Sequence, residues 1–167
     1  MATRILSIIN AFTNPDVNGD TYFEPSSIAL NANDRYPHHV ITFASQAARR
    51  GIYGKFRVPN DYVGSADLII EWTTTATSGD VVFDFDYTAI AVGESLDPSA
   101  DQETASVTDT ADATARDRNA ATIAITDANL VAGDEVQFYF VRDAADAADT
   151  LAASAYLIGL YLQYADA

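Results

Sequence analysis

Cysteine is absent from this 167-residue sequence, and histidine is scarce. Without cysteine the chain has no disulfide framework, no thiol nucleophile and no cysteine metal cluster. The two histidines, His38 and His39, are adjacent, and adjacent strand positions point to opposite faces, so they cannot easily share one metal ion. The apolar run from Ile5 to Ile9 is far too short to span a bilayer, and we expect a soluble protein without a secretion signal.

Positive charge is also scarce, because nine basic residues stand against 24 acidic ones and the formal net charge is −15. Such a chain repels nucleic acid and anionic membranes, so we expect neither as a partner. Residues 1–60 hold six basic and four acidic residues, a net of +2, whereas residues 61–167 hold three and twenty, a net of −17. Either the N-terminal third contacts a partner, or basic and acidic strands neutralise each other within one sheet.

From Pro37 onward the apolar residues recur with the period of two that is typical of half-buried strands. Turn-forming residues separate about eight such runs, and long amphipathic helical patterns are missing. We therefore predict an all-β antiparallel β-sandwich, a jelly roll of about eight strands, with an extended N-terminal arm. The predicted organisation is an N-terminal arm with loops over residues 1–36 and a jelly-roll domain over residues 37–167.

The stretch VVFDFDY, residues 81–87, tests whether the chain is an enzyme. Asp84 and Asp86 share one strand face, at a spacing within the range of glycoside hydrolase carboxylates. Such a pair needs one carboxyl in a desolvating pocket, and nothing nearby predicts one. The opposite face is apolar throughout, which favours the two aspartates as the solvent side of a half-buried strand. No GxSxG elbow or phosphate loop is present, and we predict that the chain is not an enzyme.

Two loops are rich in carboxylates, and oxygen clusters on loops can bind calcium. Neither has the full calcium-loop pattern, so we expect solvated charge and no cofactor, with calcium as the alternative. The first loop contains Asp97, Asp101 and Glu103, and the second contains Asp143, Asp146 and Asp149.

The aromatic residues divide into a core group and a surface group. Trp72 alternates in phase with Leu68 and Ile70, which predicts a core position rather than a sugar-stacking platform. Three tyrosines fall off the main apolar faces, and we expect them to make exposed or inter-subunit contacts: Tyr53, Tyr139 and Tyr161.

The N-terminal stretch RILSIINAF is apolar at a spacing that fits a helical stripe or a strand added to another sheet. It either packs back on its own domain or docks on a neighbouring subunit. The predicted partner-contact residues, for a capsid or another subunit, are Arg4, Ile5, Leu6, Ile8, Ile9, Phe12, Arg49, Arg50, Lys55 and Arg57.

Two long segments resemble structural proteins of tailed bacteriophages: EWTTTATSGDVVFDFDYTAIAVGESLD (residues 71–97) and VAGDEVQFYFVRDAADAADTLAASAYLIGLYLQY (residues 131–164). The resemblance covers about residues 50–166 and rests on turns and strand edges. It implies the jelly-roll domain of capsid decoration (cement) proteins or of head and tail fibre modules, with trimers on an icosahedral shell. It carries no catalytic residue.

We therefore expect a non-enzymatic virion protein, made in the host cytoplasm, that stabilises the capsid by binding between capsomers. Its expected partners are the major capsid protein and further copies of itself, as a homotrimer. The alternative is a phage fibre or receptor-binding module that recognises glycans on the host surface.

Overall fold

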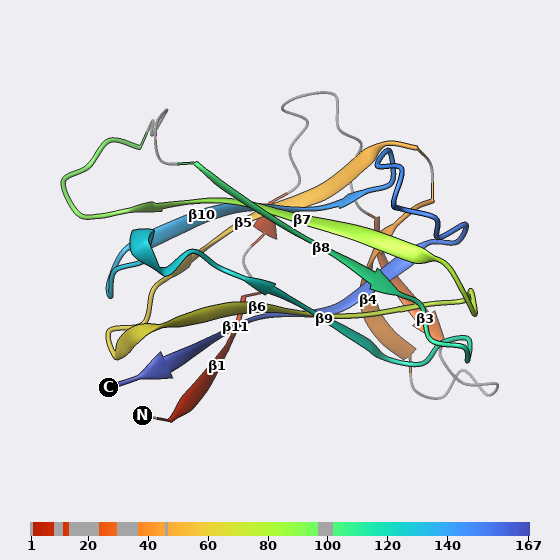
Figure 1. The fold of residues 1–167 in the computed structure, drawn as a ribbon, viewed down its shortest axis with the longest axis horizontal. Coiled ribbons are helices and arrows are strands. Elements are labelled where there is room, and N and C mark those ends of the chain that lie inside the picture. The colour runs from red at the N-terminus through yellow and green to blue at the C-terminus, as the bar shows by residue number, and fades with distance from the viewer. Residues whose placement is uncertain (1, 9–11, 14–23, 30–36, 46, 97–101) are drawn as a thin grey trace.

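The computed structural model describes residues 2–8, 12–13, 24–29, 37–45, 47–96 and 102–167. Two antiparallel sheets lie face to face in it (Figure 1). The predicted all-β sandwich is therefore confirmed. The described strands are β1 (Thr3–Ser7), β2 (Phe12–Thr13), β3 (Glu24–Ala29), β4 (Pro37–Phe43), β5 (Arg49–Arg57), β6 (Tyr62–Thr74), β7 (Asp80–Ile90), β8 (Glu103–Thr110), β9 (Asn119–Ala124), β10 (Glu135–Asp143) and β11 (Ala155–Asp166).

The first sheet, called sheet A here, has the strand order β3-β4-β11-β6-β9, and β1 also pairs with β11. The second, sheet B, has the order β2-β5-β10-β7-β8. From β4 to β7 the chain changes sheet at every step, so the connecting loops gather at the two ends of the sandwich (Figure 1). The one described helix is a 3-10 turn, η1 (Asp127–Asn129). No helix among the described residues is long and apolar enough to cross a membrane.

The core lies between the two sheets and is made mainly by alternate residues of β4 to β7 and β9 to β11. On β7, Phe83 and Phe85 are fully buried, and Phe83 packs edge-on against Trp72 of β6 with ring centroids 5.9 Å apart. The indole N–H of Trp72 donates a 2.7 Å hydrogen bond to Asp109 Oδ2 of β8. Trp72 is thus a core residue, as predicted, with its one polar atom satisfied.

The N-terminal residues 2–8 form part of the domain's own sheet. β1 pairs with β11 from Thr3↔Ala165 to Ser7↔Tyr161, and Ile8 is buried in the core. Asp166 accepts hydrogen bonds from Arg4 Nε and from the Ala2 backbone N–H, and these bonds lower the pKa of Asp166. Residues 2–8 therefore pack on their own domain, which was one of the two alternatives for this segment.

The repeated DAADAAD sequence contains two consecutive turns. Asp143 Oδ1 accepts from Ala145 N and Asp146 Oδ1 accepts from Ala148 N, at 3.1 and 2.7 Å. An aspartate side chain competes with helix formation because it accepts a hydrogen bond from the backbone N–H two residues later. The repeat places an aspartate at the first position of each turn.

Candidate functional site

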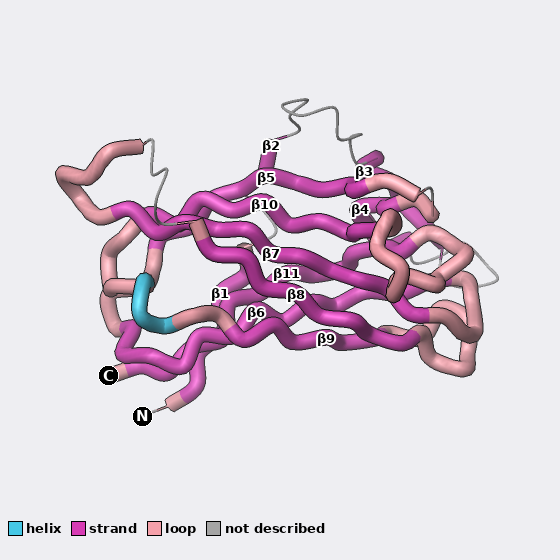
Figure 2. Tube along the Cα trace, turned by 45° about the horizontal axis from the view of Figure 1, so that its top comes forward, coloured by secondary structure: helices cyan, strands magenta, loops and turns pink. Residues whose placement is uncertain are grey.

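The outward face of sheet B is the surface on which aromatic and charged side chains meet. Figure 2 looks toward this sheet, and no described helix or strand lies over it. Residues opposite each other in paired antiparallel strands share a face. The pairings Tyr53↔Tyr139 and Tyr139↔Asp86 therefore place these three residues in one row across β5, β10 and β7. Thr104 of β8 continues the row, since it is opposite Asp86.

Tyr53 and Tyr139 form a stacked pair at the centre of this face. Their ring centroids are 4.2 Å apart with an interplanar angle of 22°. Both residues are half-buried on the outward face of the sheet. Aromatic rings with a polar tip suit ligands that present both apolar and polar surface. The prediction that both tyrosines lie off the core is confirmed.

Gly51 provides the space in which the Tyr139 ring lies. A Cβ added at this position would collide with Tyr139 Cε2 and with Val141 Cγ2. Val141 is fully buried although it lies on the outward face, so the side chains around it cover the sheet there. The glycine therefore allows the ring to approach the backbone of β5 closely.

Beside the tyrosine pair, Arg49 of β5 faces three carboxylates. Its Nη2 lies 2.9 Å from Asp84 Oδ2 and 3.5 Å from Asp86 Oδ2, and its Nε lies 3.3 Å from Asp143 Oδ2. The side chain of Asp84 is 14% exposed, whereas those of Arg49 and Asp86 are 36% and 33% exposed. The cluster is open to water on one side, and its charges do not cancel.

Burial raises the pKa of Asp84 above its ordinary value, while the hydrogen bond and the charge of Arg49 oppose that shift. The aspartates at 84 and 86 lie on the solvent side of β7, opposite the buried Phe83 and Phe85, as predicted. Arg49 Nη2 is bonded to both carboxylates and occupies the space between them. A hydrolase needs the glycosidic bond and a water molecule in that place.

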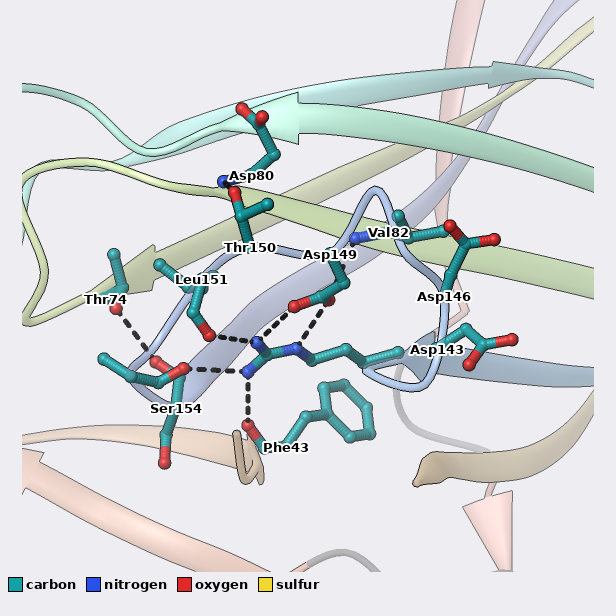
Figure 3. Close-up of polar contacts among 12 residues, drawn as sticks. Phe43, Thr74, Asp80, Val82, Asp143, Asp146, Asp149, Thr150, Leu151 and Ser154 are labelled. Carbon is teal, nitrogen blue, oxygen red and sulfur yellow. Dashed lines mark hydrogen bonds and ion pairs between the residues drawn. The ribbon is translucent and has the colours of Figure 1, made fainter. Parts of the chain in front are cut away.

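A second arginine cluster lies at the end of the sandwich where the DAADAAD loop folds back (Figure 3). Arg142 is fully buried and makes a bidentate pair with Asp149, at 2.9 Å from Nε and 2.7 Å from Nη2. Its guanidinium also donates to three backbone carbonyls, those of Phe43, Leu151 and Ala153.

Asp149 Oδ2 also accepts a hydrogen bond from the backbone N–H of Val82 in β7. Val82 lies one residue past Phe83, where the pairing of β7 with β10 ends. In Figure 3 the carboxyl groups of Asp143 and Asp146 point away from the Asp149 carboxylate. One fully buried ion pair, Arg142–Asp149, thus holds the loop between β10 and β11 against this end of the sandwich. The sequence patterns had not indicated it, because nothing local to Arg142 shows that its neighbours would bury it.

The two acidic loops do not meet the requirements of a metal site in the described part of the chain. Asp97 and Asp101 lie outside the described residues, and Glu103 Oε1 accepts from Asn129 Nδ2 at 2.6 Å. In the second loop Asp143 and Asp146 hold turns and Asp149 holds Arg142. Among the described residues no group of three or more His, Asp or Glu side chains could hold a metal ion.

The predicted partner-contact residues occupy three places. Arg4, Ile5 and Leu6 lie on β1, where Arg4 pairs with Asp166 and Ile5 is 66% exposed; Ile8 follows β1 in the core. The Phe12 backbone pairs with Gly54, and Ile9 lies outside the described residues.

The four remaining candidates lie on β5, and the structure does not gather them into one basic patch. Arg49 joins the acidic cluster, and half-buried Arg50 is opposite Arg142. Lys55 pairs with Glu135 at 3.2 Å, and Arg57 Nε donates to the Gly133 carbonyl. Arg49 and Lys55 therefore have their charge neutralised by acidic neighbours on adjacent strands, which was one of the two alternatives for the uneven charge.

No protein-family model matches this sequence. No curated protein matches it either. Solved structures do share its fold. A family 35 carbohydrate-binding module from Clostridium thermocellum is 16% identical, with a TM-score of 0.50 over 97% of this chain and 98% of that one. The family 11 carbohydrate-binding module of a cellulosomal cellulase from the same bacterium is 8% identical, with a TM-score of 0.53 over 99% and 96%.

These two neighbours are bacterial modules, so they support the jelly roll that the phage resemblance implied and leave phage origin as an expectation. Identities this low establish shared architecture and not shared binding. The chain is a β-sandwich of the kind seen in carbohydrate-binding modules.

Proposed function

We propose that the chain is a non-catalytic glycan-recognition module whose binding surface is the outward face of sheet B. The observation that carries the proposal is the stacked, half-exposed pair of Tyr53 and Tyr139, with Asp86 next in the same row. A sugar ring has apolar C–H faces and a polar rim, and an aromatic ring beside hydrogen-bonding groups is complementary to both. Glycan recognition was part of the alternative expected from the sequence, a phage fibre or receptor-binding module for host glycans.

The fold supports the proposal. The structural neighbours with TM-scores of 0.50 and 0.53 are both carbohydrate-binding modules. The absence of catalysis is part of the proposal and rests on Arg49, whose Nη2 bonds both Asp84 and Asp86. The guanidinium favours the ionised form of Asp84, and so opposes the rise in pKa that burial causes and that a general acid needs.

The test is a glycan array followed by calorimetry on the glycans that bind. We expect Tyr139→Ala to weaken binding about tenfold or more, because truncating a central aromatic anchor removes a dominant share of the binding free energy. Tyr161→Ala is the matched control, since Tyr161 is a half-buried tyrosine on β11 of the other sheet. An equal loss in both variants, or an array without any bound glycan, would contradict the proposal.

Capsid decoration is a second candidate, and exposed apolar side chains favour it. Ile5, Val63, Val92, Leu96 and Val131 are each at least half exposed. Their segments lie toward the end of the sandwich that carries both termini (Figure 1). Exposed apolar groups at one end of a domain suit attachment to a protein shell. Co-sedimentation with assembled phage capsids, together with an empty glycan array, would favour this function, with the major capsid protein as partner, a homotrimer as the bound form and the virion as location.

A further inference from the structure

Asp86 is the charged residue that strand pairing places directly beside the tyrosine pair. It lies opposite Tyr139, and opposite residues of antiparallel strands bring their Cβ atoms to about 4.5–5.5 Å. A sugar packed on the Tyr139 ring would therefore direct its rim toward the Asp86 carboxylate. Thr104, exposed on β8, is the next residue in the same row.

The Asp86 carboxylate has acceptor capacity to spare. Within the described part of the chain, its one hydrogen bond is the long 3.5 Å contact from Arg49 Nη2. The contact of the same nitrogen with Asp84 is shorter, at 2.9 Å, and Asp84 is the more buried carboxylate. An ionised carboxylate accepts hydrogen bonds at about four lone-pair positions. Asp86 can thus accept donors from a ligand while Arg49 stays with Asp84.

The local charge determines which donor is favoured. One cation, Arg49, faces Asp84, Asp86 and Asp143, so the cluster has three negative charges against one positive, a net of −2. Among the described residues, this face also carries Asp80 at the start of β7, which accepts a hydrogen bond from Thr110, Lys55, which pairs with Glu135, and Arg57. Lys55 and Arg57 lie at the end of β5 away from Arg49. Both are exposed, so water and salt screen their charges from the cluster.

We infer that Asp86 is the specificity-determining residue of the proposed site, and that it selects glycans with a cationic amine over N-acetylated and uronate glycans. This inference rests on the proposed function. A protonated sugar amine donates a charge-assisted hydrogen bond to the carboxylate and reduces the unbalanced negative charge. A uronate brings a further negative charge beside three carboxylates and is repelled.

The experiment compares three oligosaccharides by calorimetry at slightly acidic pH: β-1,4-linked glucosamine, its N-acetylated counterpart, and oligogalacturonate. We expect the glucosamine oligomer to bind most tightly. Asp86→Asn should weaken it about tenfold and change the N-acetylated oligomer by less than about twofold. Added salt should weaken the glucosamine oligomer more than the N-acetylated one.

The matched control is Asp67→Asn, which removes the same charge from β6 in the other sheet. An equal effect of the two substitutions would show that net charge and not position acts, and would overturn the inference. So would a wild-type preference for the N-acetylated or uronate oligomer. If those oligomers bind and Tyr139→Ala abolishes their binding, the proposed function stands while the inference fails. If no glycan binds at all, both fail.

Discussion

The chain uses an arginine and aspartates twice, at Arg142 and at Arg49, with different consequences. Arg142 and Asp149 have side chains 0% and 2% exposed, and every donor nitrogen of the guanidinium has a partner. Arg49 is 36% exposed, shares its donors among carboxylates on two other strands, and leaves Asp86 incompletely bonded. Burial and saturation make the first cluster structural, and access to water makes the second available to a ligand.

The comparison also shows how a saturated ion pair specifies a loop. A buried charge is tolerated only when its hydrogen bonds are complete. Arg142 therefore requires the carbonyls of Leu151 and Ala153 to turn toward it, and this fixes the return of the chain into β11. The requirement on Arg49 is weaker, because its side chain is 36% exposed and water reaches part of the guanidinium.

The largest effect on stability is expected when the buried Arg142–Asp149 ion pair is broken. Asp149→Ala leaves the Arg142 charge buried and unpaired, which should lower the free energy of unfolding by about 3–5 kcal/mol. Urea denaturation followed by tryptophan fluorescence measures the change, since Trp72 is in the core. Asp146→Ala, which removes an exposed carboxylate from the same repeat, should cost far less. Similar losses from the two would mean that the turns and not the ion pair hold the loop.

An intermediate effect is expected under the open face. Gly51→Ala places a methyl group against the Tyr139 ring and Val141, and overpacking of this kind costs about 1–3 kcal/mol. The ring should be displaced from Tyr53, so glycan binding should weaken along with stability. Lys55→Ala on the same strand is the control, since its ion pair is exposed and contributes little. Unchanged binding in the Gly51→Ala protein would argue that the stacked geometry is not required.

The smallest effect on stability is expected at Arg49 itself, where a pKa is the more sensitive measurement. Because burial raises the pKa of Asp84 above its unfolded value, its contribution to stability is full at acidic pH and is lost as the pH rises through the folded pKa. Arg49 opposes the shift, so Arg49→Met should raise the pKa of Asp84 further, and Arg49→Lys should raise it less. Carbon-13 NMR titration of the carboxyl measures both. A pKa that falls in the Met variant would contradict this account of the cluster.

Strand identity was largely predictable because it depends on local alternation. The run over residues 81–87 placed Phe83 and Phe85 inside and the two aspartates outside, and the structure agrees. β1 and β2 were harder to predict, because each is short and is a strand only through its pairing with β11 or β5. The alternation of apolar residues also predicted that Tyr53 and Tyr139 lie off the core. It could not predict that they stack, since strand register is a long-range property.

The sequence by itself determined the all-β composition, the solvent side of β7, the core position of Trp72 and the strongly acidic charge, because each follows from residue type and period. Only the tertiary structure decided which carboxylates meet which arginine and which tyrosines stack. Those contacts join residues far apart in the chain: 35 positions separate Arg49 from Asp84. Their register is set by the packing of whole sheets, and the burial that separates a structural ion pair from an accessible one is a property of the assembled sandwich.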